Sequence, residues 1–506
     1  MHRLTAFVFL LALLAGSGRA AEVIVVAAGG DLQQAIERAR PGDTILLAPG
    51  TTYPGNFVLP VKPGNQFITI RTATRDDVPR AGQRISPAHA PQLAKLKSPN
   101  RQPALRTAPG AHHWRLQLLE FPATEEGAGD IITLGDGSNA QRTHQDVPFE
   151  LIVERCFIHG DPQKGQKRGI ALNSASTVIV DSYLSDIKAK GQDAQAIAGW
   201  NGPGPYTIEN NYLEASGENF LLGGADPAIN GLITQDVTFR RNHLSKPVAW
   251  REEGWLVKNL LELKNARRVM IEGNLLEYSW LHGQGGYAIL LTPRNQDGGA
   301  PWAAVEDVTI RANIVRHAGA GLQIIGEDSN HPSGTTRRIL IVENLFYGID
   351  ASRWGGNGAF ALIGDGPSDI TIVHNTIYQS GNIVMAYGGD KSSPRQITGF
   401  RFRDNLVRHN LYGVHGADRA VGGDTLQAFF PGVDFRSNGI AGGDARLYPS
   451  GNLFVSEQEF DAQFESATGG DFRLRANSHF RRRGSDGRDL GADVVALARA
   501  FGARRQ

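Results

Sequence analysis

The sequence predicts an all-β solenoid, specifically a parallel β-helix, from three observations. A short β-type run, a polar residue and an apolar pair recur through the middle of the chain, as in IENNYL, FRRNHL and IEGNLL. The repeats follow one another at intervals of 26 to 39 residues, which are typical of solenoids and propellers. The runs are short, β-branched and bounded by Gly, Asn and Asp, without helical periodicity between them, so they are expected to be strands.

The composition fits a turn-rich folded protein. The 506 residues include 61 Gly, 25 Pro and one Cys, and 41% are hydrophobic, which suffices for a large core. A solenoid can far exceed the usual domain size because each coil contacts only its neighbours. The single Cys excludes an intramolecular disulfide and a Cys-based metal centre. The formal net charge of +1 gives no electrostatic reason to expect a nucleic-acid or membrane-surface partner.

The first twenty residues, MHRLTAFVFLLALLAGSGRA, have the pattern of a signal peptide. A basic start is followed by an apolar run from Leu4 to Ala15, which is short for a membrane span. Gly18 and Ala20 supply the small residues of a cleavage site. We therefore expect residues 1–20 to be removed and the bacterial protein to be secreted or periplasmic, without a membrane anchor.

Residues 21–45 are expected to form an N-terminal strand and a capping helix. In DLQQAIERAR, Asp31 is the expected N-cap, and Leu32, Ile36 and Ala39 share one face. Such a helix would cover the apolar end of the first coil and hide its edge.

The β-helix itself is expected over residues 46–480. A second set of strands follows each polar repeat residue by about ten positions, as in FLLGG, LLELK and AILLT. Two or three such strands per coil, without helices, are typical of a parallel β-helix, in which each coil adds about 4.8 Å. Residues 75–100 break the pattern and predict a long loop, and residues 481–506 predict a C-terminal cap that contains a short amphipathic segment.

The polar residue of each repeat is interpreted as a rung of an internal ladder. Asn tolerates the left-handed backbone of a sharp bend, and its amide can bond to the coils on both sides. Cys156 then becomes a buried, inert rung, and a role as nucleophile is the weaker alternative. The rungs are Cys156, Ser182, Asn211, Asn242, Asn274, Asn313, Asn344, Asn375 and Asn405.

A column of polar residues just after the second strands is the candidate functional surface. One face that carries acids, bases and guanidinium groups on successive coils is unusual for a solvated surface, although strand ends that lead into turns are often charged. The column consists of Asn201, Asp226, Lys264, Arg294, Glu327 and Asp365.

Glu262, Lys264 and Arg294 form the sharpest part of this column. Strand alternation in LLELK sends Leu261 and Leu263 inward, so that Glu262 and Lys264 point outward together. Arg294 falls on the next coil, and two neighbouring cations would depress the pKa of the lysine. Such a lysine can act as a general base, while the arginine binds a carboxylate or assists a leaving oxygen. These are the requirements of β-elimination in a uronic-acid polymer.

Further candidates lie nearby, each with a structural alternative. Glu218, Asn219 and Asp226 offer the hard oxygen ligands that could hold Ca²⁺, or they bond to their own turns. Aromatic residues near the strand ends could stack on sugars, or they could simply pack. These aromatic residues are Trp200, Tyr287, Trp302 and Trp354.

The segment GGDLQQAIERARPGDTILLAPGTTY resembles the opening of right-handed parallel β-helix proteins of the pectate-lyase-like superfamily. A Lys followed one coil later by an Arg is similar to the chondroitinase B and alginate lyase family, although TPRNQ around Arg294 lacks the Arg-His run of that family. The resemblance implies a right-handed helix, Lys264 as base, Arg294 as its partner, and calcium that neutralises the uronate carboxylate.

The leading hypothesis is therefore a secreted, monomeric lyase that acts on a uronic-acid polysaccharide. A glycoside hydrolase is the first alternative and needs paired carboxylates, for which Asp365, Asp390 and Glu327 are candidates. A carbohydrate-binding or surface protein without catalysis is the second alternative, because this fold hosts many functions.

Overall fold

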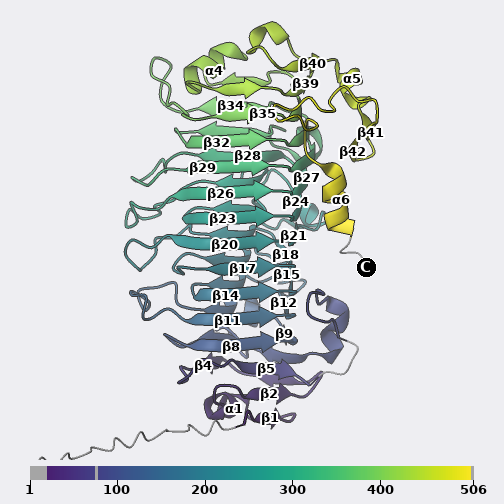
Figure 1. The fold of residues 1–506 in the computed structure, drawn as a ribbon. Coiled ribbons are helices and arrows are strands. Elements are labelled where there is room, and N and C mark those ends of the chain that lie inside the picture. Colours follow the sequence, from purple (N-terminus) through teal and green to yellow (C-terminus); the bar gives the residue numbers. More distant parts are fainter. Residues whose placement is uncertain (1–19, 74–77, 503–506) are drawn as a thin grey trace, which may run out of the picture.

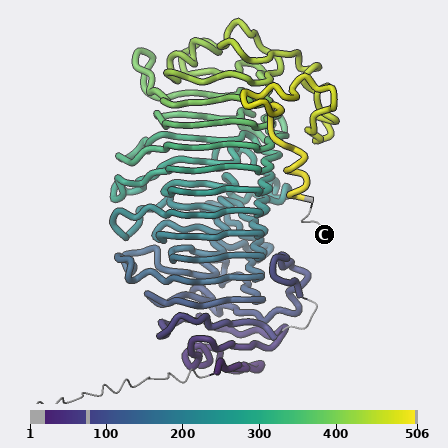
Figure 2. The backbone as a smooth tube through the Cα atoms, in the orientation of Figure 1, coloured from purple at the N-terminus to yellow at the C-terminus, as the bar shows by residue number. Residues whose placement is uncertain are grey.

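The computed structural model describes residues 20–73 and 78–502, so the predicted signal peptide lies outside the described residues except for Ala20. The chain forms a right-handed parallel β-helix in which three strands of each coil contribute to three long parallel sheets (Figure 1). The coils stack on one another along a single axis (Figure 2). We name the sheets A, B and C in the order in which the strands of one coil contribute to them.

Sheet A consists of β1 (Val23–Val26), β2 (Thr44–Leu47), β5 (Ile68–Thr72), β8 (His112–Gln117), β11 (Phe149–Glu154), β14 (Ala175–Val180), β17 (Tyr206–Glu209), β20 (Thr234–Arg240), β23 (Ala266–Glu272), β26 (Val305–Arg311), β29 (Arg337–Val342), β32 (Ser368–Val373), β35 (Arg401–Arg403) and β38 (Asp434–Arg436). Sheet B consists of β3 (Thr52–Pro54), β6 (Ala94–Lys97), β9 (Leu119–Phe121), β12 (Phe157–His159), β15 (Tyr183–Ile187), β18 (Tyr212–Ala215), β21 (His243–Ser245), β24 (Leu275–Ser279), β27 (Ile314–Ala318), β30 (Leu345–Ile349), β33 (Thr376–Gln379), β36 (Leu406–Arg408), β39 (Gly439–Ala441) and β40 (Leu453–Val455). Sheet C consists of β4 (Phe57–Leu59), β7 (Leu105–Thr107), β10 (Asp130–Leu134), β13 (Arg168–Leu172), β16 (Gln195–Gly199), β19 (Glu218–Leu222), β22 (Leu261–Leu263), β25 (Tyr287–Leu291), β28 (Ala320–Ile325), β31 (Ala361–Gly364), β34 (Val384–Tyr387) and β37 (Val414–Gly416).

Few other elements interrupt the coils in the described ranges. The helices are α1 (Leu32–Arg38), α2 (Trp250–Glu253), α3 (Ala351–Trp354), α4 (Gly423–Phe429), α5 (Glu457–Asp461) and α6 (Val494–Gly502), with 3-10 turns at Pro87–Gln92, Glu125–Gly127 and Ala445–Leu447. The last strands, β41 (Phe464–Ser466) and β42 (Asp471–Leu474), form a small antiparallel pair outside the helix.

The predicted internal ladder is confirmed and extends further than the sequence indicated. The backbone N–H of each rung donates to the side-chain oxygen of the next, for example from Asn242 to Asn274 at 2.8 Å and from Asn274 to Asn313 at 2.8 Å. Asn438 and Asn452 continue the series at its end. Because these amides are buried, the ladder satisfies polar groups that would otherwise be costly at every sharp bend between sheets A and B.

Cys156 is the first rung, as predicted. It is fully buried, and its backbone N–H donates to the Ser182 hydroxyl at 3.1 Å. Burial raises the pKa of the thiol to about 12, so the reactive thiolate is strongly disfavoured.

The left-handed conformation of the bend belongs to the residue before each rung, which corrects the sequence interpretation. Asn210, Arg241 and Glu343 have φ values of 53°, 56° and 57°, whereas the rung residues are not left-handed. The Asn is therefore selected for its amide hydrogen bonds, and the preceding residue, of varied type, carries the strain.

The N-terminal cap agrees with the prediction. Helix α1 begins after Asp31, whose side chain accepts the Gln34 N–H at 2.9 Å, and it buries Leu32 and Ile36 against the first coil. The strand β1 before it already pairs with β2, so the β-helix begins before residue 46.

The C-terminal end differs from the prediction. The coils end at β40, well before residue 480, and α4 covers their end by burying Leu426 and Phe429. Helix α6 runs back along the side of the stack (Figures 1 and 2), where Leu497 joins an apolar cluster that includes Leu345 and Leu406. An amphipathic pattern predicts one buried face of a helix but not the surface on which that face packs.

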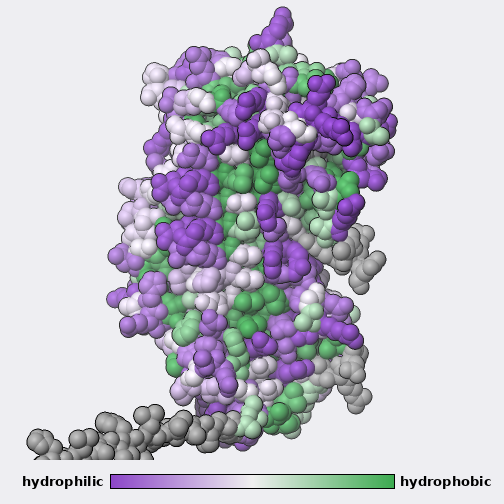
Figure 3. Space-filling view, viewed as in Figure 1, coloured by the Kyte–Doolittle hydropathy of each residue, from purple (hydrophilic) through white to green (hydrophobic). Residues whose placement is uncertain are grey.

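The outer face of sheet A carries ion pairs between successive coils. Arg268 pairs with Asp236 at 2.7 Å on successive coils, and similar pairs recur along the sheet. Figure 3 shows this side of the molecule, where hydrophilic residues dominate and hydrophobic atoms reach the surface in patches. Among the described residues, no helix has both the length and the apolar character needed to cross a bilayer.

Candidate functional site

Titratable and amide side chains gather on the outer face of sheet C, around β16, β19 and β22. We call this group the sheet C cluster. Its members are Gln195, Glu218, Lys258, Asn259, Glu262 and Lys264. They come from three successive coils and from the loop that leads into β22.

Glu262 and Lys264 lie together on the outer face, as strand alternation predicts. Leu261 and Leu263 are fully buried inside, while Glu262 Oε1 lies 2.7 Å from Lys264 Nζ. The Glu262 carboxylate is itself completely covered, and its second oxygen accepts the Asn259 amide at 3.2 Å. The Lys264 side chain keeps 15% exposure, so it is the accessible partner of the pair.

Arg294 follows β25 on the adjacent coil, next to Lys264. Its backbone N–H donates to the Lys264 carbonyl at 3.0 Å. Its guanidinium, however, pairs with the fully covered carboxylate of Asp328 at 3.0 Å. The two cations were expected to act on each other unpaired, but each has a buried carboxylate of its own. The side chain of Arg294 is 27% exposed and can still meet a ligand.

Glu218 is a buried acid beside Glu262. Burial first, and then the charge of Glu262, raise the pKa of Glu218 to about 7. Lys258 Nζ at 3.6 Å and the Gln195 amide at 3.0 Å act against this increase. The cluster therefore contains a carboxyl group that can change its protonation state near neutral pH.

Lys258 and Asn259 were not predicted from the sequence. Lys258 pairs with Asp193 at 2.6 Å. Burial lowers the pKa of Lys258, but the carboxylates of Glu218 and Asp193 outweigh burial, so the pKa is raised. The Oδ1 atom of Asn259 is buried without a hydrogen-bond partner among the described residues. Both residues lie in a loop whose path depends on tertiary packing, and no strand pattern marks them.

A group of tryptophans holds this loop. Trp250, Trp255, Trp280 and Trp354 pack around Val257, immediately before Lys258. The ammonium of Lys188 lies 5.2 and 4.9 Å from the rings of Trp250 and Trp255. Trp354, which was a candidate for sugar stacking, is therefore a packing residue.

The predicted calcium ligands do not form a site. Glu218 points out of the coil, whereas Asn219 points inward, where its Oδ1 accepts from Lys246 Nζ at 2.9 Å. Lys246 is fully buried, and burial lowers its pKa to about 7. The Asn219 amide oxygen thus bonds to Lys246 and is unavailable to a metal.

Asp226 is also unavailable to a metal, because its carboxylate already accepts hydrogen bonds from the backbone. Its carboxylate accepts the backbone N–H groups of Gln296, Asp297 and Gly299 at 2.7 to 3.0 Å. It closes the loop after β25 as a turn residue would. Within the described part of the chain, no three His, Cys, Asp or Glu side chains gather as a metal would require.

Asn201 and Trp200 also prove structural. Asn201 is fully buried and donates to the carbonyls of Asp136 and Gln141 at 2.9 Å, so the prediction of a substrate contact was wrong. Trp200 donates from Nε1 to the Gly137 carbonyl at 2.8 Å and stacks under the guanidinium of Arg168. Sequence position alone could not separate an outward side chain from one that is folded under a loop.

Two other candidate aromatic residues are anchored in the same way. Trp302 donates to the Leu232 carbonyl at 3.0 Å. Tyr287 is 5% exposed, and its hydroxyl accepts from the Asn357 amide at 2.7 Å.

The remaining candidates lie farther along the stack. Glu327 pairs with Arg395 at 2.7 Å. Asp365 contacts Tyr387, and burial raises the pKa of its carboxyl group. Asp390 bonds within its own turn to Ser392. Glu327 lies near enough to Asp365 for its charge to add to the increase in the pKa of Asp365, whereas Asp390 is engaged within its own turn.

The stability of Glu218→Gln should depend on pH. Because the folded state raises the pKa of Glu218, ionisation costs the wild type stability as the pH rises from about 4.5 to about 7. Glutamine avoids this cost, so the variant should gain about 1–3 kcal/mol relative to wild type at pH 8 and almost nothing at pH 4. Denaturant unfolding at several pH values measures this difference.

Glu126→Gln is the control for this experiment. Its carboxylate is exposed, and a hydrogen bond from Lys164 lowers its pKa, so no gain with rising pH is expected. An equal gain at every pH for Glu218→Gln would contradict the assigned burial of an ionisable acid.

The architecture places the protein among the right-handed parallel β-helix folds. No family model matches the sequence, and no similar curated sequence was found. Solved structures do match. The PL6 family alginate lyase AlyGC shares 15% identity at a TM-score of 0.58, over 93% of this chain and 58% of that enzyme.

Two further structures extend this comparison. A mannuronic acid specific family 6 lyase from human gut microbiota shares 13% identity at a TM-score of 0.51, over 88% of this chain and 95% of that one. The catalytic unit of a GH87 α-1,3-glucanase from Streptomyces thermodiastaticus shares 15% identity at a TM-score of 0.50, over 85% and 70%. At such identities the likeness establishes the fold, and the reaction has to be argued from the site.

Proposed function

We propose that this protein is a polysaccharide-active enzyme and, more specifically, a lyase that cleaves a uronic-acid polymer by β-elimination. One observation carries the proposal. Lys264 and Arg294 lie on adjacent coils at the same edge of sheet C, each fixed by a covered carboxylate and each still reaching solvent. Two fixed, accessible cations suit a substrate that carries a carboxylate on each sugar.

The contacts of Arg294, Lys264 and Glu262 assign each residue a role in the reaction. Arg294 binds the uronate carboxylate and stabilises the negative charge that develops on it. Lys264 is the base that takes the proton alpha to that carboxylate, the C4–C5 double bond forms, and the C4–O4 bond breaks. The leaving oxygen takes a proton from the newly formed ammonium. Glu262 is a positioning residue, because it contacts Lys264 and is shielded from substrate.

The test is the appearance of unsaturated sugar ends. Purified residues 21–506 are incubated with alginate, polygalacturonate, chondroitin and hyaluronan, and ultraviolet absorbance is followed. We expect an increase with at least one of these polymers and none with a neutral glucan. The absence of an increase with every polymer would overturn the lyase assignment.

A glycoside hydrolase is the second candidate because of Asp365 and Glu327. Burial raises the pKa of the Asp365 carboxyl group and the charge of Glu327 adds to this increase, as a general acid beside a second carboxylate requires. This candidate predicts new reducing ends without ultraviolet absorbance. Export through the signal peptide and action as a monomer are part of the same proposal.

A further inference from the structure

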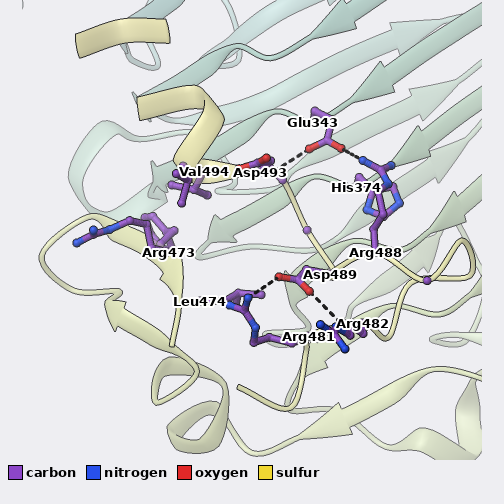
Figure 4. A pocket seen from close by; sticks show the side chains of 15 residues that line it. Glu343, His374, Arg473, Leu474, Arg481, Arg482, Arg488, Asp489, Asp493 and Val494 are labelled. Carbon is purple, nitrogen blue, oxygen red and sulfur yellow. Dashed lines mark hydrogen bonds and ion pairs between the residues drawn. The ribbon is translucent and has the colours of Figure 1, made fainter. Parts of the chain in front are cut away.

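A cavity lies apart from the sheet C cluster, between the side of the β-helix and the C-terminal segment (Figure 4). Its volume is about 460 Å³. One wall consists of Glu343 and His374, at the bends between sheets A and B. The opposite wall consists of residues 472–474 and residues 481–495, which lead into α6. The volume lies within the range of small-ligand sites.

The acids in this cavity are engaged by the wall itself. Glu343 pairs with Arg488 at 2.6 Å and accepts the backbone N–H of Asp493 at 2.7 Å. The carboxylate of Asp493 accepts the Ala496 N–H at 2.9 Å at the start of α6. The carboxylates of Glu343 and Asp493 therefore hold the C-terminal segment against the coil.

Two arginines of the cavity, Arg481 and Arg482, make fewer contacts than its acids. Asp489 accepts the backbone N–H of Arg482 at 2.9 Å and lies 3.8 Å from the guanidinium of Arg481. The guanidinium of Arg482 has no hydrogen-bond or ionic partner among the described residues. A fixed backbone with a free, planar cation beside the cavity is suited to bind a carboxylate.

His374 provides a second, independent observation. Its side chain is 3% exposed and lines the cavity, and its Nε2 lies 3.1 Å from Asp486 Oδ2. Its Nδ1 is buried without a partner among the described residues. If Nε2 donates to Asp486, Nδ1 is left as an acceptor, and a buried acceptor without a partner is costly unless a ligand or water satisfies it.

We propose that this cavity binds a small acidic sugar of the uronate type. The sugar carboxylate lies on the Arg482 guanidinium, and the sugar ring lies against the wall that His374 lines. Phe472 and Val494 supply an apolar wall for the face of the sugar ring. This site is separate from the sheet C cluster, and the choice of a uronate as its ligand rests on the proposed function.

The experiment measures binding directly by titration calorimetry, using Lys264→Arg protein, which is expected to stay folded and inactive, so that the ligand is not consumed. The probes are digalacturonate and dimannuronate, with cellobiose and inorganic phosphate as controls. We expect at least one diuronate to bind, and Arg482→Gln to weaken it about tenfold or more without a folding defect, because the Arg482 side chain makes no contact to lose. Arg446→Gln is the matched control, since Arg446 is 88% exposed and pairs with Asp444 outside the cavity.

The outcomes separate the two proposals. No diuronate binding, equal binding by Arg482→Gln, or binding of cellobiose or phosphate at the same strength would overturn the cavity assignment. Release of unsaturated ends by the wild type is a different measurement, and its failure would overturn only the lyase proposal.

Discussion

Lys264→Ala is expected to lower the release of unsaturated ends by about 10²–10⁴-fold, the usual contribution of a general base. The variant loses the only group of the Glu262–Lys264 pair that reaches solvent. Initial rates of absorbance increase on the responsive polymer measure this effect. Because Lys264→Ala also leaves the buried Glu262 carboxylate without its cation, its thermal unfolding must be compared with wild type.

Two further variants separate chemistry from packing. Lys264→Arg keeps a cation beside Glu262 but cannot supply a neutral amine, so it should remain folded and inactive. Lys164→Ala removes another lysine that is paired with a glutamate, here Glu126 at 2.8 Å on the surface, and should leave activity unchanged. Activity of Lys264→Arg within threefold of wild type would exclude Lys264 as the base.

Asn274→Ala is expected to destabilise the β-helix by about 2–6 kcal/mol. Asn274 Oδ1 accepts the Asn242 N–H at 2.8 Å, and its amide donates to the Phe239 carbonyl at 3.0 Å. The alanine variant leaves both buried backbone groups unsatisfied, and each such loss costs about 1–3 kcal/mol. The shift in denaturant midpoint measures the change.

Asn274→Ser tests whether the hydrogen bonds cause this loss. Ser182 shows that a hydroxyl can accept the rung N–H, since it bonds to Cys156 in an early coil. The serine variant should therefore be more stable than the alanine variant, and Asn330→Ala in an exposed loop should be neutral. Equal stabilities of Asn274→Ala and Asn274→Ser would show that the ladder acts through side-chain volume alone.

The fold could be predicted because its signals are local and repeated. The Asn column, the strand alternation in LLELK and the Asp31 cap each depend on a few neighbouring residues, and the structure confirms them. The repetition also compensated for weak individual signals, since one rung carries little information and nine carry much. The error about the left-handed bend arose because backbone strain and side-chain bonding lie on adjacent residues, and the sequence cannot assign them separately.

The candidate site could be predicted only in part. Alternation placed Glu262 and Lys264 on one face, and coil spacing placed Arg294 beside them. Sequence could not show that Asn201 lies beneath a loop or that Asn219 points inward to Lys246. Both errors concern loops and partners that are distant in the chain.

The sequence by itself determined the stacked coil, its internal ladder and the face that bears the polar column, because these follow from a period that each coil repeats. The tertiary structure alone decided which charges in that column are paired, which are covered, and that the last helix lies along the side of the stack. These properties depend on desolvation and on contacts between residues that are far apart in sequence. The electrostatics of a site are set by such contacts, and a repeat pattern does not encode them.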